Sequence, residues 1–187
     1  MRLFLPAFLL LAPLVFASAH PATAREPAQG LTIACVIGEQ HWSATQPPVN
    51  LSHIFCGELS RRDKAVGLHA RPGGTLPATA RDFTLLKAPD ADGVYEARFR
   101  IGEGRRWRQK QRSSFFPDHC EPADILASIL FAEAQSPTRP KFRGASGPEP
   151  RQDGYCYGLT GRPLMLEGWL LPDGPKRINT AWPVRGE

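Results

Sequence analysis

The sequence predicts an α+β domain with antiparallel sheets, and three patterns along the chain support that prediction. Residues 94–101 alternate between apolar and polar side chains, which indicates a strand with one buried face. Residues 122–134 place their apolar side chains on one helical stripe, which indicates a single clear central helix. Residues 164–171 and 178–184 flank a Pro-Asp-Gly turn, which indicates a hairpin.

Particular side chains define each of these elements. The apolar members of the strand share one face: Tyr95, Ala97, Phe99 and Ile101. The helix begins with Pro122, whose fixed φ suits the first helical position, and Asp124 follows in the first turn, where the helix dipole favours an acid. The apolar stripe of the helix consists of Ile125, Leu126, Ile129 and Leu130.

The remaining segments are predicted to be loops or short elements. Residues 50–83 are rich in Gly, Arg and His, which favours a structured loop region with short helical or strand pieces. The N-terminal portion of the domain is therefore expected to be partly helical. Residues 136–152 hold four prolines and two glycines, which predicts a loop.

Length and hydropathy are consistent with one exported domain. The 187 residues, 42% of them hydrophobic, are enough for one domain with a core and too few for two. Arg2, an apolar stretch up to residue 16 and small residues at 17–19 predict a secretory signal peptide over residues 1–19, with an alternative cut after residue 24. No internal apolar run reaches the about 18–20 residues that span a bilayer. We expect residues 20–49 to form a leader and the start of the domain, residues 50–187 to form the domain, and the mature protein to be secreted or periplasmic and free of the membrane.

All four cysteines lie beyond both cut sites: Cys35, Cys56, Cys120 and Cys156. An even number of cysteines in an exported chain favours two disulfides. The alternative is a zinc site, but zinc ligands usually come in close pairs, and these cysteines are 21, 64 and 36 residues apart. We therefore predict two disulfides, with all three pairings open.

A run of positive charge indicates an anionic partner. Residues 98–112 carry seven Lys or Arg against one acid, Glu103, and Trp107, Phe115 and Phe116 lie among or beside these charges. A solvated strand and turn would also explain such a run. Cations next to aromatic side chains, however, suit a phosphate backbone that carries unstacked bases, and this predicts RNA as the partner.

Two of the five histidines stand in a distinctive context. His53 and His69 are each flanked by glycine, apolar residues and a following basic residue, whereas His119 is assigned no catalytic role. Two imidazoles and a lysine are sufficient for metal-free cleavage of RNA. One imidazole removes the proton of the ribose 2′-OH, the other protonates the departing 5′-oxygen, and the lysine stabilises the charge on the phosphoryl oxygens. The product would be a 2′,3′-cyclic phosphate, and DNA would resist because it lacks the nucleophile.

Five short motifs, taken together, resemble the EndoU-type endoribonucleases, and in particular the bacterial EndoU domain. They are residues 53–57 (HIFCG), residues 67–69 (GLH), residues 93–97 (GVYEA), Lys110 followed by residues 113–117 (SSFFP), and residues 180–183 (TAWP). No single motif is specific, but five in the right order across about residues 50–184 are. The resemblance implies an EndoU-like fold and an endoribonuclease that cleaves single-stranded RNA near uridines.

The resemblance also implies roles for individual residues. The two catalytic histidines of the family fall on His53 and His69, with His69 favoured as the base and His53 as the acid. The catalytic lysine falls on Lys110, and Arg112 is the alternative cation, although a guanidinium is not an equivalent point charge. A disulfide at Cys56 would fix the position of His53, three residues earlier in the chain.

The residues expected to bind the base are Thr180 and Trp182. Positions i and i+2 of a strand share a face, so a hydroxyl can bond the uracil edge while the ring stacks on the base. Trp182 stands where the family usually has Tyr. An indole still stacks, but it lacks the phenolic hydroxyl, which bears on strict uridine preference more than on cleavage.

Cofactors and further partners are less defined. Some members of the wider family respond to manganese, but no cofactor is expected here, since no Asp, Glu and His cluster has ligand spacing. The alternative function is a catalytically silent RNA- or polyanion-binding envelope protein of the same fold. Many bacterial relatives are toxic tips of contact-delivered proteins, which leaves open a toxin role with a cognate immunity protein as partner.

Overall fold

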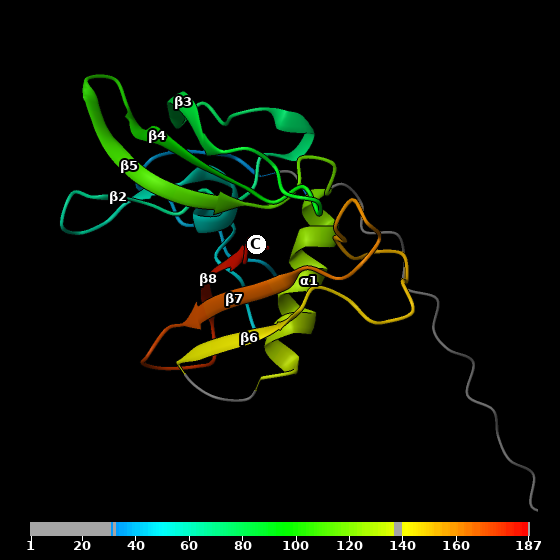
Figure 1. The fold of residues 1–187 in the computed structure, drawn as a ribbon. Helices are drawn as coiled ribbons and strands as arrows, with labels where there is room; N and C mark the ends of the chain where they lie inside the picture. Colours follow the sequence, from blue (N-terminus) through cyan, green and yellow to red (C-terminus); the bar gives the residue numbers. More distant parts are fainter. Residues whose placement is uncertain (1–30, 32, 137–139, 187) are drawn as a thin grey trace, which may run out of the picture.

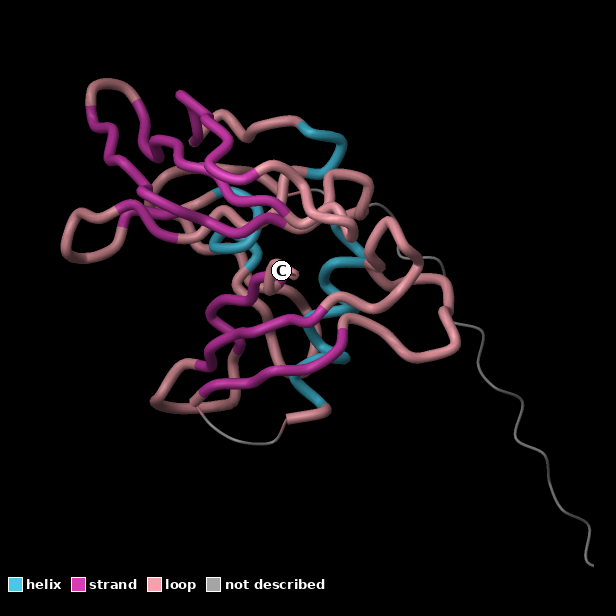
Figure 2. The backbone as a smooth tube through the Cα atoms, viewed as in Figure 1, coloured by secondary structure: helices cyan, strands magenta, loops and turns pink. Residues whose placement is uncertain are grey.

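A computed structural model describes residue 31, residues 33–136 and residues 140–186. The predicted signal peptide, its alternative cut and the first part of the leader lie outside the described residues. Figures 1 and 2 show the elements, which follow one another as η1 (Ser52–Cys56), β1 (Glu58–Leu59), β2 (Ala65–Val66), η2 (Pro72–Gly74), β3 (Ala80–Lys87), β4 (Tyr95–Glu103), β5 (Arg106–Phe115), α1 (Pro122–Ala134), β6 (Lys141–Ala145), β7 (Met165–Leu170) and β8 (Ile178–Pro183). Here η1 is a π-helical turn and η2 a 3₁₀ turn.

The strands form three antiparallel sheets in which neighbours follow chain order. β3, β4 and β5 form one three-stranded sheet, β6, β7 and β8 form another, and β1 pairs with β2. Figure 1 shows the two larger sheets as separate layers, with α1 beside β6 and β7. β8 also contacts β5 and η1, and so connects the two layers. The predicted α+β class, with antiparallel sheets and one clear helix, is confirmed.

Two hydrophobic cores hold these layers, one for each larger sheet. In the first, α1 buries Ile125 and Ile129 against Phe142 of β6 and Leu166 of β7. In the second, the predicted face of β4 packs with Phe115 of β5 and with Leu68. The predicted alternating strand, the helix bounds and the hairpin of β7 and β8 are therefore confirmed.

β6 lies inside residues 136–152, and the prediction of a loop there is wrong for this strand. Phe142 is buried in the core beside α1. Gly144 lets the strand lie against the helix, because a Cβ at this position would be 2.9 Å from Cα of Ala132. The strand forms because it pairs with β7 and packs against α1. Neither contact can be recognised from the residue pattern of a segment rich in proline and glycine.

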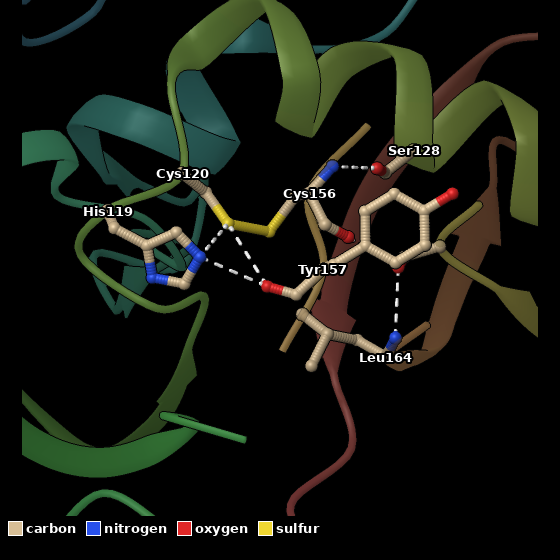
Figure 3. Close-up of a disulfide and its surroundings, with 7 residues drawn as sticks. His119, Cys120, Ser128, Cys156, Tyr157 and Leu164 are labelled. Carbon is tan, nitrogen blue, oxygen red and sulfur yellow. Dashed lines mark hydrogen bonds between the residues drawn. A yellow bond between two sulfur atoms is a disulfide. The ribbon is translucent and has the colours of Figure 1, made fainter. Parts of the chain in front are cut away.

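The two predicted disulfides are present, and the structure selects one of the three pairings. Cys35 bonds to Cys56 at the end of η1, and Cys120, just before α1, bonds to Cys156. Figure 3 shows the second disulfide, where the backbone N–H of Cys156 donates to Oγ of Ser128 in α1 at 2.8 Å. There too, Nε2 of His119 donates to the carbonyl oxygen of Tyr157 at 3.1 Å. His119 thus contacts the disulfide region.

Within the residues that the structure describes, no helix has the length and apolar character needed to cross a membrane.

Both disulfides are expected to stabilise the fold by restricting the unfolded chain. Cys35→Ser/Cys56→Ser, which opens a loop of 21 residues, is predicted to lower the free energy of unfolding by about 3 kcal/mol. Cys120→Ser/Cys156→Ser opens 36 residues and is predicted to cost slightly more, about 4 kcal/mol. Urea unfolding of each variant against the oxidised parent measures both values, and equal midpoints for all three proteins would contradict the prediction.

Candidate active site

Two segments carry the predicted histidines, and backbone hydrogen bonds join them. His53 lies in η1, and His69 lies in the extended segment after β2. The N–H of Leu68 donates to the carbonyl oxygen of His53 at 2.7 Å, and the N–H of His69 donates to that of Ile54 at 2.8 Å. The two imidazole rings consequently lie 6.0 Å apart between centroids and are inclined by 25°.

Gly67 allows the two segments to lie this close. Its φ of +73° is a left-handed conformation that glycine adopts without strain. A Cβ at this position would overlap the carbonyl oxygen of His53 and lie 3.0 Å from ring atom Cδ2. Any larger residue would therefore push the two histidine segments apart.

Both histidines line a cleft of about 500 Å³ between η1, β5 and β8. All five predicted site residues line it, namely His53, His69, Lys110, Thr180 and Trp182. Its other lining residues are Val66, Gly67, Glu96, Arg112, Ser113, Ser114, Trp169 and Asn179. Side chains that are far apart in the sequence thus converge on one concave surface.

Glu58, at the start of β1, holds the ring of His53. Oε2 of Glu58 accepts a hydrogen bond from Nδ1 of His53 at 2.6 Å, with both side chains largely buried. The fully buried Asn50 supports both partners. Its Oδ1 accepts from the backbone N–H of His53 at 3.1 Å, and its Nδ2 donates to the Glu58 carboxylate at 3.4 Å.

The environment of Glu58 keeps it ionised. Burial acts to raise the pKa of Glu58, but the hydrogen bond and charge of His53, with hydrogen bonds from Gln40 and Asn50, outweigh burial and lower this pKa below its usual value. A carboxylate can only accept hydrogen bonds, so Nδ1 of His53 is the donor. Nε2 is therefore the nitrogen of His53 that remains for a substrate.

His69 has the opposite kind of environment. Its Nδ1 lies 3.1 Å from the carbonyl oxygen of Ser114 and 3.1 Å from Oγ of Ser113. The Ser113 hydroxyl itself donates to the carbonyl oxygen of Leu68 at 2.8 Å, so it accepts from the ring. Because both oxygens are acceptors, Nδ1 carries the proton, and Nε2 of the neutral ring keeps its lone pair.

Burial and nearby cations keep His69 neutral. Burial, then the positive charges of His53 and Lys110, lower the pKa of His69 well below its usual value, while the hydrogen bond to Ser114 acts in the other direction. At neutral pH the site thus contains one histidine beside a carboxylate and one unprotonated histidine. This difference allows the two rings to act as acid and base.

Among the described residues, Lys110, on β5, is one of two cations that line the cleft. Burial lowers the pKa of Lys110, and no carboxylate pairs with it in the described part of the chain. The alternative cation, Arg112, also lines the cleft, but its Nε lies 3.4 Å from Oε2 of Glu96 and its side chain is 68% exposed. Lys110 is therefore the better placed of the two to face a phosphate.

Thr180 and Trp182 project from the same face of β8, as their spacing predicts. Their cross-strand partners on β7 are Trp169 and Glu167. The ring centroid of Trp182 lies 5.9 Å from that of His69. Oγ1 of Thr180 is buried and has no hydrogen-bond partner among the described residues. Leaving a buried hydroxyl unpaired costs about 1–3 kcal/mol, so this oxygen is suited to bind a ligand in the cleft.

Four supporting residues of the site were not found from sequence patterns: Asn50, Glu58, Ser113 and Ser114. A signal was present for two of them, since Asn50 and Glu58 flank the His53 motif and a carboxylate close to a histidine is a common way to orient its ring. Ser113 and Ser114 lie within one of the five motifs, but their bonds to His69 depend on how β5 packs against it.

The expectation that Phe115 and Phe116 stand beside the cations as stacking surfaces is wrong. Both side chains are fully buried, Phe115 in the core of the β3–β5 sheet and Phe116 in the core around α1. Trp107 is half-buried, and the guanidinium of Arg81 lies 3.9 Å above its ring centroid. Three aromatic residues near a run of cations thus have structural contacts.

The donor groups of the cleft do not suit a resident metal ion. In residues 31, 33–136 and 140–186, no group of three or more His, Cys, Asp or Glu side chains is arranged to hold one. The carboxylate bonded to the first histidine, that of Glu58, is already shared among His53, Gln40 and Asn50.

A family model for the bacterial EndoU nuclease matches residues 49–159, which is more than half of the chain. The chain therefore belongs to the bacterial EndoU nuclease family, and the resemblance that five motifs indicated is confirmed. The matched segment includes His53, His69 and Lys110, while Thr180 and Trp182 lie beyond it. No curated protein and no solved structure matches the chain significantly.

The pair of Glu58 and His53 is predicted to make stability depend on pH. Because folding lowers the pKa of Glu58 from 4.5, its carboxylate stabilises the fold fully above pH 4.5, and this contribution is lost as pH falls through the lowered pKa. Urea unfolding between pH 3 and pH 7 should show a smaller acid-side decline for Glu58→Gln than for the parent. Glu39→Gln, which changes an exposed acid beside His41, is the control. Parallel curves for the parent and Glu58→Gln would refute the prediction.

Proposed function

We propose that this protein is an endoribonuclease that cleaves single-stranded RNA by attack of a ribose 2′-OH on the adjacent phosphorus, without a metal. The observation that carries the proposal is one cleft lined by two histidines in opposite environments, beside a lysine that no described carboxylate neutralises. Membership of a nuclease family supports the same class of reaction.

His69 is the general base of this reaction. Its Nδ1 is occupied by Ser113 and Ser114, so the lone pair of Nε2 accepts the proton of the 2′-OH. Its lowered pKa keeps the ring unprotonated near neutral pH. The freed 2′-oxygen attacks phosphorus and forms the cyclic phosphate.

His53 is the general acid. The carboxylate of Glu58 stabilises the protonated ring through Nδ1, and Nε2 gives its proton to the 5′-oxygen as the bond from phosphorus to that oxygen breaks. The proton taken by His69 and the proton given by His53 balance, and water returns both rings to their starting states. The two separated ends are a 2′,3′-cyclic phosphate and a 5′-hydroxyl.

Lys110 stabilises the charge that builds on the phosphoryl oxygens in the transition state. A half-buried ammonium acts in a region of lower dielectric than water, where its attraction for an oxyanion is stronger. Because the nucleophile is the 2′-OH, DNA is not a substrate.

Thr180 and Trp182 hold the base on the 5′ side of the cut. The unpaired Oγ1 of Thr180 bonds the edge of the base, and the indole of Trp182 supplies a stacking surface next to His69. The family resemblance favours uridine as this base. The preference is less strict than in relatives with tyrosine at this position, because Trp182 lacks the phenolic hydroxyl.

The compartment of this activity is secreted or periplasmic. Two disulfides are typical of proteins that fold in an oxidising environment, and the predicted signal peptide agrees with export. RNA scavenging and a toxin role with a cognate immunity protein are both compatible with this compartment.

The catalytic roles predict large and selective losses of activity. His53→Ala and His69→Ala should each lower kcat/KM on a uridine-containing RNA by about 10²–10⁴, and Lys110→Ala by about 10²–10³. His119→Ala, which removes an imidazole beside the second disulfide, should retain activity. End-group analysis should find 2′,3′-cyclic phosphates, and cleavage should persist in EDTA.

Two results would overturn this assignment. Loss of cleavage in EDTA that manganese restores would show metal dependence. RNA that is bound and left intact by the unmodified protein would instead favour the catalytically silent binding protein.

The base-binding pair predicts separable effects on affinity and selectivity. Trp182→Ala should raise KM about tenfold, since base stacking contributes about 1–3 kcal/mol. Thr180→Val keeps the shape of the side chain but removes the hydroxyl, and should reduce discrimination between uridine and other bases about tenfold. Cut-site sequencing on RNAs that differ at one base measures both, with Thr84→Val on the exposed strand β3 as control. Unchanged selectivity in Thr180→Val would contradict its role.

A further inference from the structure

Two neighbouring loops carry clustered cations outside the cleft. The β1–β2 loop contains Arg61, Arg62 and Lys64, all exposed, and the turn between β4 and β5 precedes Arg106 and Arg108. Figure 1 shows both loops projecting from the same side of the molecule.

Asp63 joins the two loops. Its Oδ1 accepts from Nε of Arg106 at 2.9 Å and from Nη2 at 2.6 Å, and its Oδ2 accepts from Nε of Arg108 at 2.7 Å. These bonds lower the pKa of Asp63, so the bridge is charged at neutral pH. One acid thus holds two guanidinium groups side by side while the other loop cations remain exposed.

The cations of β5 form a line that begins in the cleft. Lys110, Arg108 and Arg106 pair with Phe99, Ile101 and Glu103 of β4, respectively. Alternate residues of a strand share a face and lie about 7 Å apart, a spacing comparable to that of successive phosphates in an extended RNA strand. The line therefore leads from the cleft lysine to the arginines that Asp63 holds.

The β1–β2 loop flanks this line and is also continuous with the cleft. β2 follows the loop directly, and Val66 and Gly67, at its end, line the cleft. The six cations (Arg61, Arg62, Lys64, Arg106, Arg108 and Lys110) are termed the cationic track. Besides Asp63, the acid next to these loops is Glu103, the last residue of β4.

We propose that the cationic track binds the phosphates of an RNA strand beyond the scissile nucleotide, so that an RNA of several nucleotides is a better substrate than a dinucleotide. This inference rests on the proposed ribonuclease activity and extends its site from the cleft to the tip of the β4–β5 hairpin. Phosphate contacts of this kind position a strand without reading its sequence.

The other face of the same sheet also has two arginines that share one acid, but none of these three residues lines the cleft. Arg100 lies 3.7 Å from Asp82, and Arg81 also pairs with Asp82 at 3.6 Å. Arg98 is exposed and adjacent in the register to Thr84 of β3, away from the cleft. Within residues 98–112, Lys110, Arg108 and Arg106 thus lead outward from the cleft along β5, whereas Arg98 and Arg100 do not line the cleft.

RNA fits the cationic track better than a lipid surface does. Binding to a membrane interface combines cations with apolar side chains that insert among the lipids. The exposed large apolar residues of the described chain are Val36, Leu85, Leu86, Leu159, Met165 and Trp169, and all of them lie outside both loops. The cationic track instead begins at Lys110 in the cleft and continues along β5, which suits the repeated phosphates of an RNA strand.

The test separates binding along the cationic track from cleavage. Cleavage of a uridine-containing dinucleotide is compared with that of an RNA of about twelve nucleotides, and binding is measured by fluorescence anisotropy with a 2′-O-methyl RNA of the same length, which lacks the nucleophile. The variant is Arg61→Ala/Arg62→Ala, and the control is Arg98→Ala/Arg151→Ala, which removes two exposed cations elsewhere.

The longer RNA should be cleaved with about tenfold higher kcat/KM than the dinucleotide at low salt. In Arg61→Ala/Arg62→Ala this advantage should shrink, and the slope of log affinity against log salt should fall by about 0.7 for each phosphate that the variant no longer binds. The control variant should keep the advantage and the slope of the parent.

Three results would overturn the inference. The first is equal cleavage of short and long RNA by the parent, and the second is equal behaviour of the two double variants. The third is a loss of binding by Arg61→Ala/Arg62→Ala to vesicles of phosphatidylglycerol and phosphatidylcholine with unchanged RNA binding. If neither RNA were cleaved, the proposed function would fail, but the anisotropy arm would still decide whether the cationic track binds RNA.

Discussion

Three backbone hydrogen bonds, donated by Leu68, His69 and Ala70 to carbonyl oxygens of η1, are the contact on which the site depends, because they set the distance between the two histidine rings. Further contacts fix η1 and the segment after β2 to the rest of the domain. The Cys35–Cys56 disulfide and the hydrogen bond from Oγ1 of Thr79 to the carbonyl oxygen of Cys56 hold the end of η1. The N–H of Phe116 donates to the carbonyl oxygen of His69 at 2.8 Å and so joins the second histidine to the end of β5. The geometry of the rings is thereby tied to the sheet of β3, β4 and β5.

In the proposed reaction, one histidine acts as the acid and the other as the base because the surroundings of the two rings differ. His69 is buried near two cations and bonds to neutral oxygens, so its charged form is disfavoured. His53 instead faces Glu58, whose ionisation that contact supports. Each environment would be unsuitable for the other role, since a carboxylate behind His69 would favour its protonated form. The proposed difference between acid and base therefore depends on the residues that contact Nδ1 of each ring.

How much of this site could be predicted depended on whether its members share a local motif. His53, His69 and Lys110 lie in short motifs that occur in the same order as in the EndoU family, and all three line the cleft. Glu58 lies five residues from His53, yet nothing in that spacing distinguishes it from a surface acid until β1 places it beneath the ring. Phe115 and Phe116 are close to cations along the chain, but both side chains are buried. Closeness in sequence does not show which face of a strand is buried.

Local periodicity was sufficient for β4, α1 and the hairpin of β7 and β8, because the alternation of apolar residues records which face of an element is buried. The even number of cysteines likewise indicated two disulfides. Tertiary packing decided three other features. These are the pairing of the cysteines, the formation of β6 and the positions of the cations of residues 98–112 relative to the cleft. Each of these depends on contacts between residues distant in the chain, and the free energy of such contacts leaves no periodic trace in the segments that make them.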